Sequence, residues 1–116
     1  MGGDKKYFPI QILNKEFYIP LYVHPVYFSM TWEQCLEEAE SEGKRLPTLN
    51  ELKYLYDIHN ELKIGKISRG NFWSSDPYES GMSLYPRKWF FSFRHGRPDW
   101  EYANSKIGLL IKVKDL

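Results

Sequence analysis

Two short helix signals, each opened by a capping box, constrain the fold of this chain more than any other feature. Thr31 with Gln34, and Thr48 with Glu51, have the spacing at which two side chains satisfy the first backbone N–H groups of a helix. Apolar residues follow each box at helical spacing and predict two short amphipathic helices, the second over residues 48–63. The remaining segments have the pattern of strands and turns, so the sequence predicts an α+β fold.

Strand patterns lie on both sides of the helices. Residues 7–28 alternate in the manner of paired strands, with a turn at Asn14-Lys15 and with Pro20 indicating an edge position or a bulge. The run from Ile107 to Val113 has the aliphatic and β-branched content of a buried strand, and we expect charged residues from Lys112 onward to close it at the edge.

A hairpin is predicted in the C-terminal half. Its first strand alternates rings with other residues, His95-Gly96 is a turn signal, and residues 99–102 would form the returning strand. Alternation places Phe90 on the face opposite the rings expected in the core. The side chains that we expect to be mostly buried are Trp32, Leu52, Leu55, Trp73, Trp89, Phe91 and Phe93.

The length of 116 residues and a hydrophobic content of 42% predict a single domain, residues 1–116, with a core of its own. Sixteen Lys and Arg against fifteen Asp and Glu leave a formal charge of +1, so no overall field marks a nucleic-acid or membrane-surface binder. The chain lacks a membrane-spanning apolar run, and its start lacks the apolar stretch of a signal peptide. We expect no membrane insertion and no nucleic-acid partner, and a cytoplasmic or virion-associated location unless the chain is a fragment of an exported protein.

The residues that could carry catalysis form no coherent pattern. Cys35 falls on the apolar stripe of the first helix, where a free thiol is a small core residue, and this placement outweighs its pairing with any of the three His residues as nucleophile and base. The carboxylates have no spacing that indicates a hydrolytic pair, and no phosphate-binding glycine loop or metal-ligand motif occurs. We therefore expect no enzymatic activity, no cofactor and no metal. The acidic outer face of the first helix is expected to be only a solvated surface.

The segment from Leu84 to Tyr102 interleaves basic and aromatic side chains. Guanidinium groups bind carboxylate, sulfate or phosphate, while ring faces stack on sugars, bases or peptide rings. One interpretation is that the rings fill the core and the charges only solubilise the other face. The other is a binding surface, because the rings exceed what one hairpin face can bury. The candidate ligand-binding residues are Tyr78, Tyr85, Arg87, Arg94, Arg97, Trp100 and Tyr102.

Five short motifs, each weak alone, follow one another between about residues 30 and 113. They are Thr31-Trp32, Arg45-Leu46-Pro47-Thr48, Glu51-Leu52, Trp73-Ser74-Ser75, and the strand from Trp89 through Phe93 to Gly96. In this order they resemble the Lcl C-terminal-domain-like family of bacteria and phages, typified by the C-terminal domain of collagen-like adhesins. The resemblance implies a C-type-lectin-like fold: two helices packed on small antiparallel sheets, a loop-rich C-terminal half, and adjacent termini that pair a strand near Phe17 to Val23 with the final strand.

The resemblance also bears on function. Calcium-dependent sugar binding in true lectins of this fold needs loop and strand motifs that Pro98-Asp99-Trp100 does not match, and oxidases of this fold need two active-site cysteines, whereas this chain has one. Phage receptor-binding proteins of the fold use the segment matching residues 76–105 as their ligand surface. The resemblance therefore implies a non-catalytic recognition module that binds a protein or an acidic glycan through its C-terminal loop and hairpin surface. The alternative is a structural or assembly role, as a virion or adhesin component whose aromatic surface joins copies into a homo-oligomer.

Overall fold

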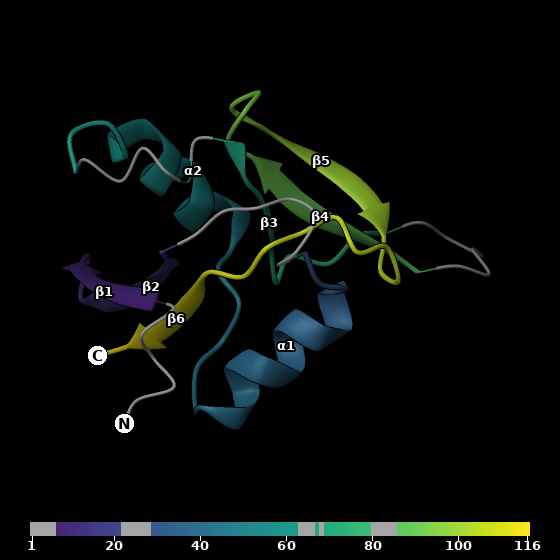
Figure 1. Ribbon diagram of the computed structural model, residues 1–116, viewed down its shortest axis with the longest axis horizontal. Helices are drawn as coiled ribbons and strands as arrows, with labels where there is room; N and C mark the ends of the chain where they lie inside the picture. The colour runs from purple at the N-terminus through teal and green to yellow at the C-terminus, as the bar shows by residue number, and fades with distance from the viewer. Residues whose placement is uncertain (1–6, 22–28, 63–66, 68, 80–85) are drawn as a thin grey trace.

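The structure is a computed structural model that describes residues 7–21, 29–62, 67, 69–79 and 86–116. It contains two helices and two small antiparallel sheets, which confirms the α+β class (Figure 1). The first sheet has the order β1-β2-β6, and its strands are β1 (Tyr7–Ile12), β2 (Lys15–Pro20) and β6 (Lys112–Asp115). The second has the order β3-β4-β5, and its strands are β3 (Asn71–Trp73), β4 (Arg87–Ser92) and β5 (Arg97–Tyr102).

Both helices begin at the predicted capping boxes. At the start of α1 (Trp32–Ser41), the Thr31 hydroxyl accepts the Gln34 N–H at 3.1 Å, and the Gln34 side chain accepts the Thr31 N–H at 2.9 Å. The second box caps α2 (Leu49–Ile58) in the same way. The predicted end of this helix, near residue 63, is wrong. The helix ends at Ile58, and the chain then turns. Leu62 donates its N–H to the Ile58 carbonyl at 3.0 Å, which keeps its side chain packed against the core, as the apolar stripe predicts.

The β1-β2 hairpin turns one residue earlier than predicted. Leu13 and Asn14 form the turn with φ values of 55° and 58°. A two-residue turn that matches the right-handed twist of the paired strands needs both residues in the left-handed region. Lys15 therefore already belongs to β2. The predicted edge position of Pro20 is also wrong, since β2 lies between β1 and β6. The proline is tolerated at the end of this central strand because β6 pairs with β2 only as far as Tyr18.

The β4-β5 hairpin forms where it was predicted, with Ser92 opposite Arg97 at its closed end. Gly96 has a φ of +67° and donates its N–H to the Ser92 carbonyl at 2.7 Å. A Cβ at this position would lie 2.5 Å from the Tyr56 hydroxyl oxygen. Glycine is thus required here both by the backbone conformation and by the close approach of α2.

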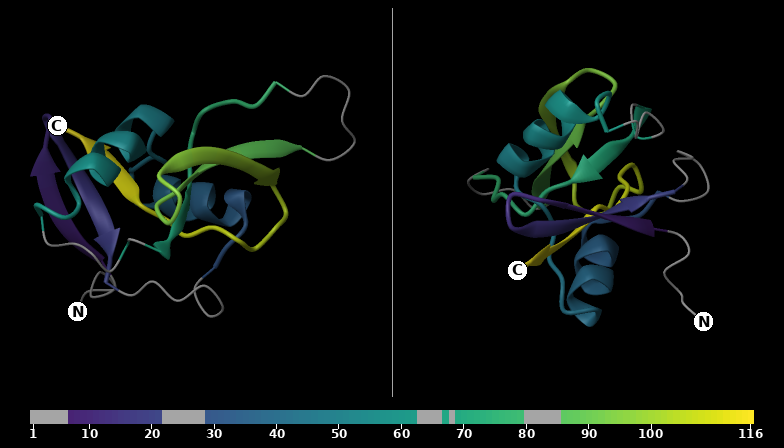
Figure 2. Two further views of the ribbon diagram at one scale, coloured as in Figure 1. Left: turned by 90° about the horizontal axis from the view of Figure 1, so that it is seen from above. Right: turned by 90° about the vertical axis from the view of Figure 1, so that its left-hand side faces the viewer.

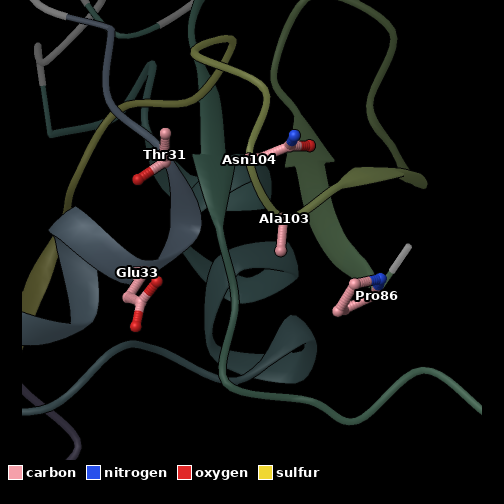
Figure 3. Close-up of a pocket in the computed structure, with 5 residues that line it drawn as sticks. All are labelled: Thr31, Glu33, Pro86, Ala103 and Asn104. Atoms are coloured by element: carbon pink, nitrogen blue, oxygen red, sulfur yellow. The ribbon is translucent and has the colours of Figure 1, made fainter. Parts of the chain in front are cut away.

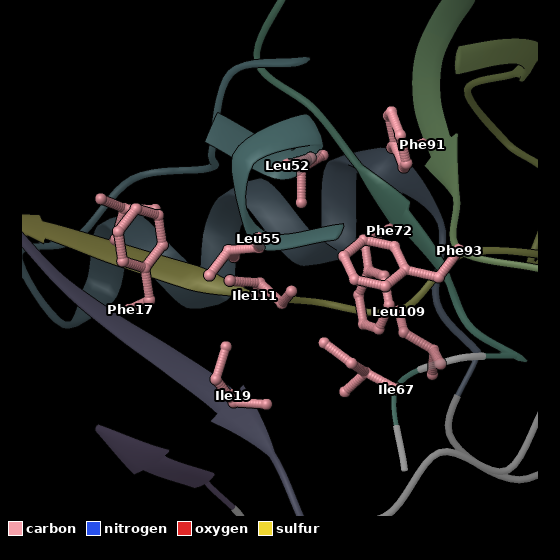
Figure 4. Packing of buried hydrophobic residues seen from close by; sticks show 11 residues of the cluster. Phe17, Ile19, Leu52, Leu55, Ile67, Phe72, Phe91, Phe93, Leu109 and Ile111 are labelled. Atoms are coloured by element: carbon pink, nitrogen blue, oxygen red, sulfur yellow. The ribbon is translucent and has the colours of Figure 1, made fainter. Parts of the chain in front are cut away.

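The core consists of two clusters on opposite faces of one layer of extended chain. Successive residues of a strand point to opposite faces, so β3, β4 and residues 109–113 each contribute side chains to both clusters. Figure 2 shows α2 and α1 on opposite sides of this layer. The cluster beside α2 consists of Phe17, Ile19, Leu52, Leu55, Ile67, Phe72, Phe91, Phe93, Leu109, Ile111 and Val113 (Figure 4). The cluster beside α1 consists of Cys35, Ala39, Leu46, Trp73, Phe90 and Leu110.

This two-sided core confirms the expected buried side chains and corrects the placement of Phe90. Trp32 and Trp89 are less completely buried than the other five, because Trp32 is the first residue of α1 and Trp89 lies toward the open end of the hairpin. Phe90 does lie opposite Phe91, as alternation predicts, but it is 8% exposed because the α1 cluster covers that face. Phe90, which was counted among the rings that one hairpin face cannot bury, is therefore a core residue.

The C-terminal run is extended and buried, but only its last residues form a regular strand. Gly108 bridges to Met30, and Leu109 bridges to Phe72 of β3, so this segment connects the second sheet to the first. The expectation that Lys112 closes the strand at an exposed edge is wrong, because this side chain is 2% exposed.

Lys112 is instead neutralised by α1. Its Nζ atom lies 2.7 Å from a Glu42 carboxylate oxygen, 3.1 Å from one of Glu38, and 4.0 Å from the centre of the Tyr7 ring. The acidic face of α1 was expected to be only solvated. Two of its carboxylates in fact hold the C-terminal strand against the helix.

Candidate functional site

The structure brings four of the seven candidate ligand-binding residues together. In the register of β4 and β5, Arg87 lies opposite Tyr102 and Trp89 lies opposite Trp100. Directly paired residues share a face of the sheet, and the Tyr78 ring packs on that face. We call Tyr78, Arg87, Trp89, Trp100 and Tyr102 the aromatic–arginine cluster.

Arg87 is at the centre of this cluster. Its guanidinium carbon lies 4.5 Å from the centre of the Trp100 ring, 5.9 Å from that of Tyr102 and 6.0 Å from that of Tyr78. The rings also contact one another, with centres 5.0 Å apart for Tyr78 and Trp89 and 5.5 Å apart for Trp100 and Tyr102. A guanidinium above aromatic faces is attracted by their negative potential, so the rings hold the side chain in a defined position.

Among the residues that the structure describes, this guanidinium contacts rings but no anion. The Nε atom of Arg87 is buried and has no hydrogen-bond partner. Within the described part of the chain, none of the ion pairs involves Arg87. A buried donor left unpaired costs about 1–3 kcal/mol. The cluster therefore retains a cation whose hydrogen-bonding capacity the fold does not use.

Of the other three predicted residues, Arg94 and Arg97 do not join the cluster. Arg94 is exposed in the hairpin turn, and Arg97 begins β5 on the opposite face, because its side chain alternates with those of Pro98 and Trp100. Five residue steps separate Arg97 from the Arg87–Tyr102 pair, a distance of about 17 Å. Tyr85 lies outside the residues that the structure describes.

A pocket of about 330 Å³ opens where the hairpin meets the N-terminus of α1 (Figure 3). It is lined by Thr31, Glu33, Pro86, Ala103 and Asn104. Sequence analysis missed it because three separate segments form it. A backbone hydrogen bond from the Trp32 N–H to the Ala103 carbonyl, 3.1 Å long, holds two of these segments together.

The groups considered for nucleophilic catalysis are dispersed. Cys35 is a fully buried residue of α1, and burial, reinforced by the nearby Glu38 carboxylate, raises the pKa of its thiol, so the group stays protonated. His59 packs against the rings of Tyr56 and Phe93 on the far side of the sheet layer, His95 lies in the hairpin turn, and His24 falls outside the described residues. In the ranges that the structure covers, no three His, Cys, Asp or Glu side chains gather where they could hold a metal ion.

A scan against protein-family models and a search of curated proteins find no match to this chain. None of the helices in the described ranges is long and apolar enough to cross a membrane. The arrangement of the residues is therefore the basis for inferring what the chain does.

Proposed function

We propose that this chain is a non-catalytic recognition module that binds a protein or an acidic glycan through the aromatic–arginine cluster. The observation that carries the proposal is the state of Arg87, a half-buried guanidinium 4.5 Å from the centre of the Trp100 ring, with a buried Nε that has no partner. An anionic ligand group would supply the counter-charge that the fold omits. The half-buried rings would add contact area at small entropic cost.

The resemblance to collagen-like adhesin domains supports the same proposal. Two helices, two small antiparallel sheets and the pairing of β2 with β6 fit a C-type-lectin-like fold. In that fold the segment matching residues 76–105 carries the ligand surface, and all five cluster residues fall within it. The burial of the lone thiol fits a module that acts without nucleophilic catalysis.

The test compares two arginines of one hairpin. The parent, Arg87→Ala and Arg97→Ala proteins are applied to glycan and protein arrays, and the dissociation constants of any ligand found are then measured in solution. We expect Arg87→Ala to weaken binding by about 30-fold or more, as for a hot-spot residue. Arg97→Ala is the matched control and should bind like the parent, with equal melting temperatures showing that all three proteins are folded.

Two results would contradict the proposal. One is a ligand whose affinity depends on Arg97 and not on Arg87. The other comes from light scattering at micromolar concentration: if the parent is an oligomer that Trp100→Ala converts to a monomer, the cluster is an interface between copies and the chain has an assembly role.

A further inference from the structure

We infer that the group bound by Arg87 is a single carboxylate carried on an apolar, CH-rich surface, and not a phosphate monoester or a polyanion. The inference rests on the proposed function, and it specifies the chemistry of the ligand at that site. Three features of the aromatic–arginine cluster lead to it.

The first feature is the part of the guanidinium that a ligand can reach. The Nε atom is buried, so the edge formed by Nε and one terminal nitrogen is closed. The two terminal nitrogens form no hydrogen bond to a described residue, and neither is among the buried atoms that lack a partner. They are therefore accessible at the surface. Their parallel N–H groups match the two oxygens of a planar carboxylate in an end-on, bidentate contact.

The second feature is the separation of this charge from the other basic residues of the β4-β5 hairpin. Lys88, the neighbouring cation in the sequence, points to the opposite face, where its Nζ lies 4.0 Å from the centre of the Trp32 ring. Arg94 and Arg97 lie at the other end of the hairpin. One positive charge matches one carboxylate, whereas a phosphate monoester carries a charge of about −1.5 to −2, and a polyanion is bound by several cations.

Negative groups beside the cluster strengthen this argument. The side chains of Asp99 and Glu101 stay at the edge of β5, where they accept the N–H groups of Trp100 and Tyr102 at 2.8 and 2.9 Å. A ligand that extends across this edge would bring any further anionic group near these two carboxylates. Repulsion would then oppose binding, while a ligand with one carboxylate directed at Arg87 avoids it.

The third feature is the surrounding rings. Tyr78, Trp89 and Trp100 are half-buried, and Tyr102 is 36% exposed, so a ligand body beside the carboxylate meets aromatic surface. Ring faces bind the CH-rich face of a sugar and also aliphatic side chains. The shared ligand chemistry is thus a carboxylate next to an apolar face. A uronic-acid sugar and an acidic residue of a protein both have it.

The experiment is a titration of the ¹⁵N-labelled full chain followed by NMR. The signals are those of the Arg87 Nε–H and of the indole N–H groups of Trp89 and Trp100, with the Trp73 indole as an internal control. The probes are methyl glucuronide, its neutral methyl ester, glucose 6-phosphate and N-acetylaspartate methylamide. Comparing the glucuronide with the aspartate derivative identifies which source of carboxylate binds more tightly.

We expect saturable shifts of the cluster signals with at least one carboxylate probe, and binding of the ester and the phosphate at least about tenfold weaker. The variant Arg87→Lys keeps the charge but loses the planar fork, so its carboxylate binding should also weaken about tenfold or more. In Arg87→Ala, added methylguanidinium should restore carboxylate binding, because the rings that hold the guanidinium remain.

The outcomes separate the two proposals. If the phosphate or the ester binds as tightly as the carboxylates, or Arg87→Lys binds like the parent, the carboxylate assignment is wrong while the recognition function stands. If no probe shifts the cluster signals, the assignment is also wrong. The recognition function fails with it only when ligands from the arrays bind Arg87→Ala as tightly as the parent.

Discussion

At the residue scale, Arg45 shows how one side chain of a short motif joins three elements. Its two terminal nitrogens donate to the two carboxylate oxygens of Glu51, each at 2.8 Å, and the guanidinium also donates to Asp115 of β6 at 2.9 Å. Glu51 in turn accepts the Thr48 N–H of the capping box at 2.9 Å and the ammonium of Lys15 in β2. The start of α2 is thereby fixed to two strands of the first sheet.

This network predicts a pH dependence of stability. Burial acts to raise the pKa of Glu51, but hydrogen bonds from Arg45, Lys15 and Thr48 outweigh it and lower the pKa from 4.5 to about 2. Because the folded-state pKa is the lower one, the stabilisation is fully present above about pH 4.5 and is lost as the pH falls toward 2. We expect the melting temperature of Glu51→Gln to fall less than that of the parent across this window. Parallel curves for the two proteins, followed by circular dichroism, would refute the assignment.

Neighbouring rings of β4 provide a second test at the residue scale. Phe90 is buried beside α1, whereas Trp89 is half-buried and packs against Tyr78. Phe90→Ala should therefore lower the free energy of unfolding by about 3–5 kcal/mol, and Trp89→Ala should lower it by less, although tryptophan is the larger side chain. Urea denaturation measures both values. A greater loss in Trp89→Ala would mean that the two faces of the strand are assigned the wrong way round.

At the scale of elements, β5 is an edge strand whose outward N–H groups are occupied. The Trp89 carbonyl accepts the Ser74 N–H at 3.0 Å, so the backbone of Trp89 bonds toward β3. Its cross-strand partner Trp100 must then direct its own N–H away from β4, and Tyr102, two residues later, does the same.

Side chains of β5 itself close this edge. The carboxylates of Asp99 and Glu101 accept the outward N–H groups of the residues that follow them, and Pro98 has no N–H to offer. Blocked edges prevent pairing between copies of a protein, so we do not expect β5 to pair with a second copy.

Removing the acceptors should open the edge. We expect the double variant Asp99→Ala/Glu101→Ala to self-associate by strand pairing, detected as an increased sedimentation coefficient in analytical ultracentrifugation. The matched control, Asp99→Asn/Glu101→Gln, loses the same charge but keeps an acceptor oxygen at each position, and it should sediment like the parent. If both variants associate equally, the loss of charge repulsion explains the effect, and the blocking of the edge by the two carboxylates is not supported.

At the scale of the whole molecule, the two sheets share one core. Phe17 and Ile19 of β2 lie in the same cluster as Phe91 of β4 and Leu55 of α2, and residues 109–113 run between both clusters. If one sheet unfolded, apolar side chains of the other sheet that pack against it would be exposed to water.

We therefore expect a single cooperative unfolding transition. Far-ultraviolet circular dichroism reports the backbone, and fluorescence reports the tryptophans, of which none lies in the first sheet. The two midpoints should coincide in the parent and should shift together in Phe17→Ala. If the substitution moved only the dichroism midpoint, the first sheet would unfold separately.

Local chemistry alone determined several parts of this protein. The starts of both helices follow from Thr31 and Thr48, and the hairpin turn follows from Gly96, because a capping box or a tight turn is satisfied by residues within about four positions of one another. The α+β class follows from the same local signals. Sequence alternation also placed Arg87, Trp100 and Tyr102 on one hairpin as candidates for a site.

Tertiary structure decided what those local signals leave open. The position of α1 on the second face of the layer determined that Phe90 is buried, and the distant carboxylates of that helix determined that Lys112 is buried as well. Strand register separated Arg87 from Arg97. These outcomes depend on contacts between residues far apart in the chain. A one-residue change in register reverses the face of a side chain without altering its local pattern.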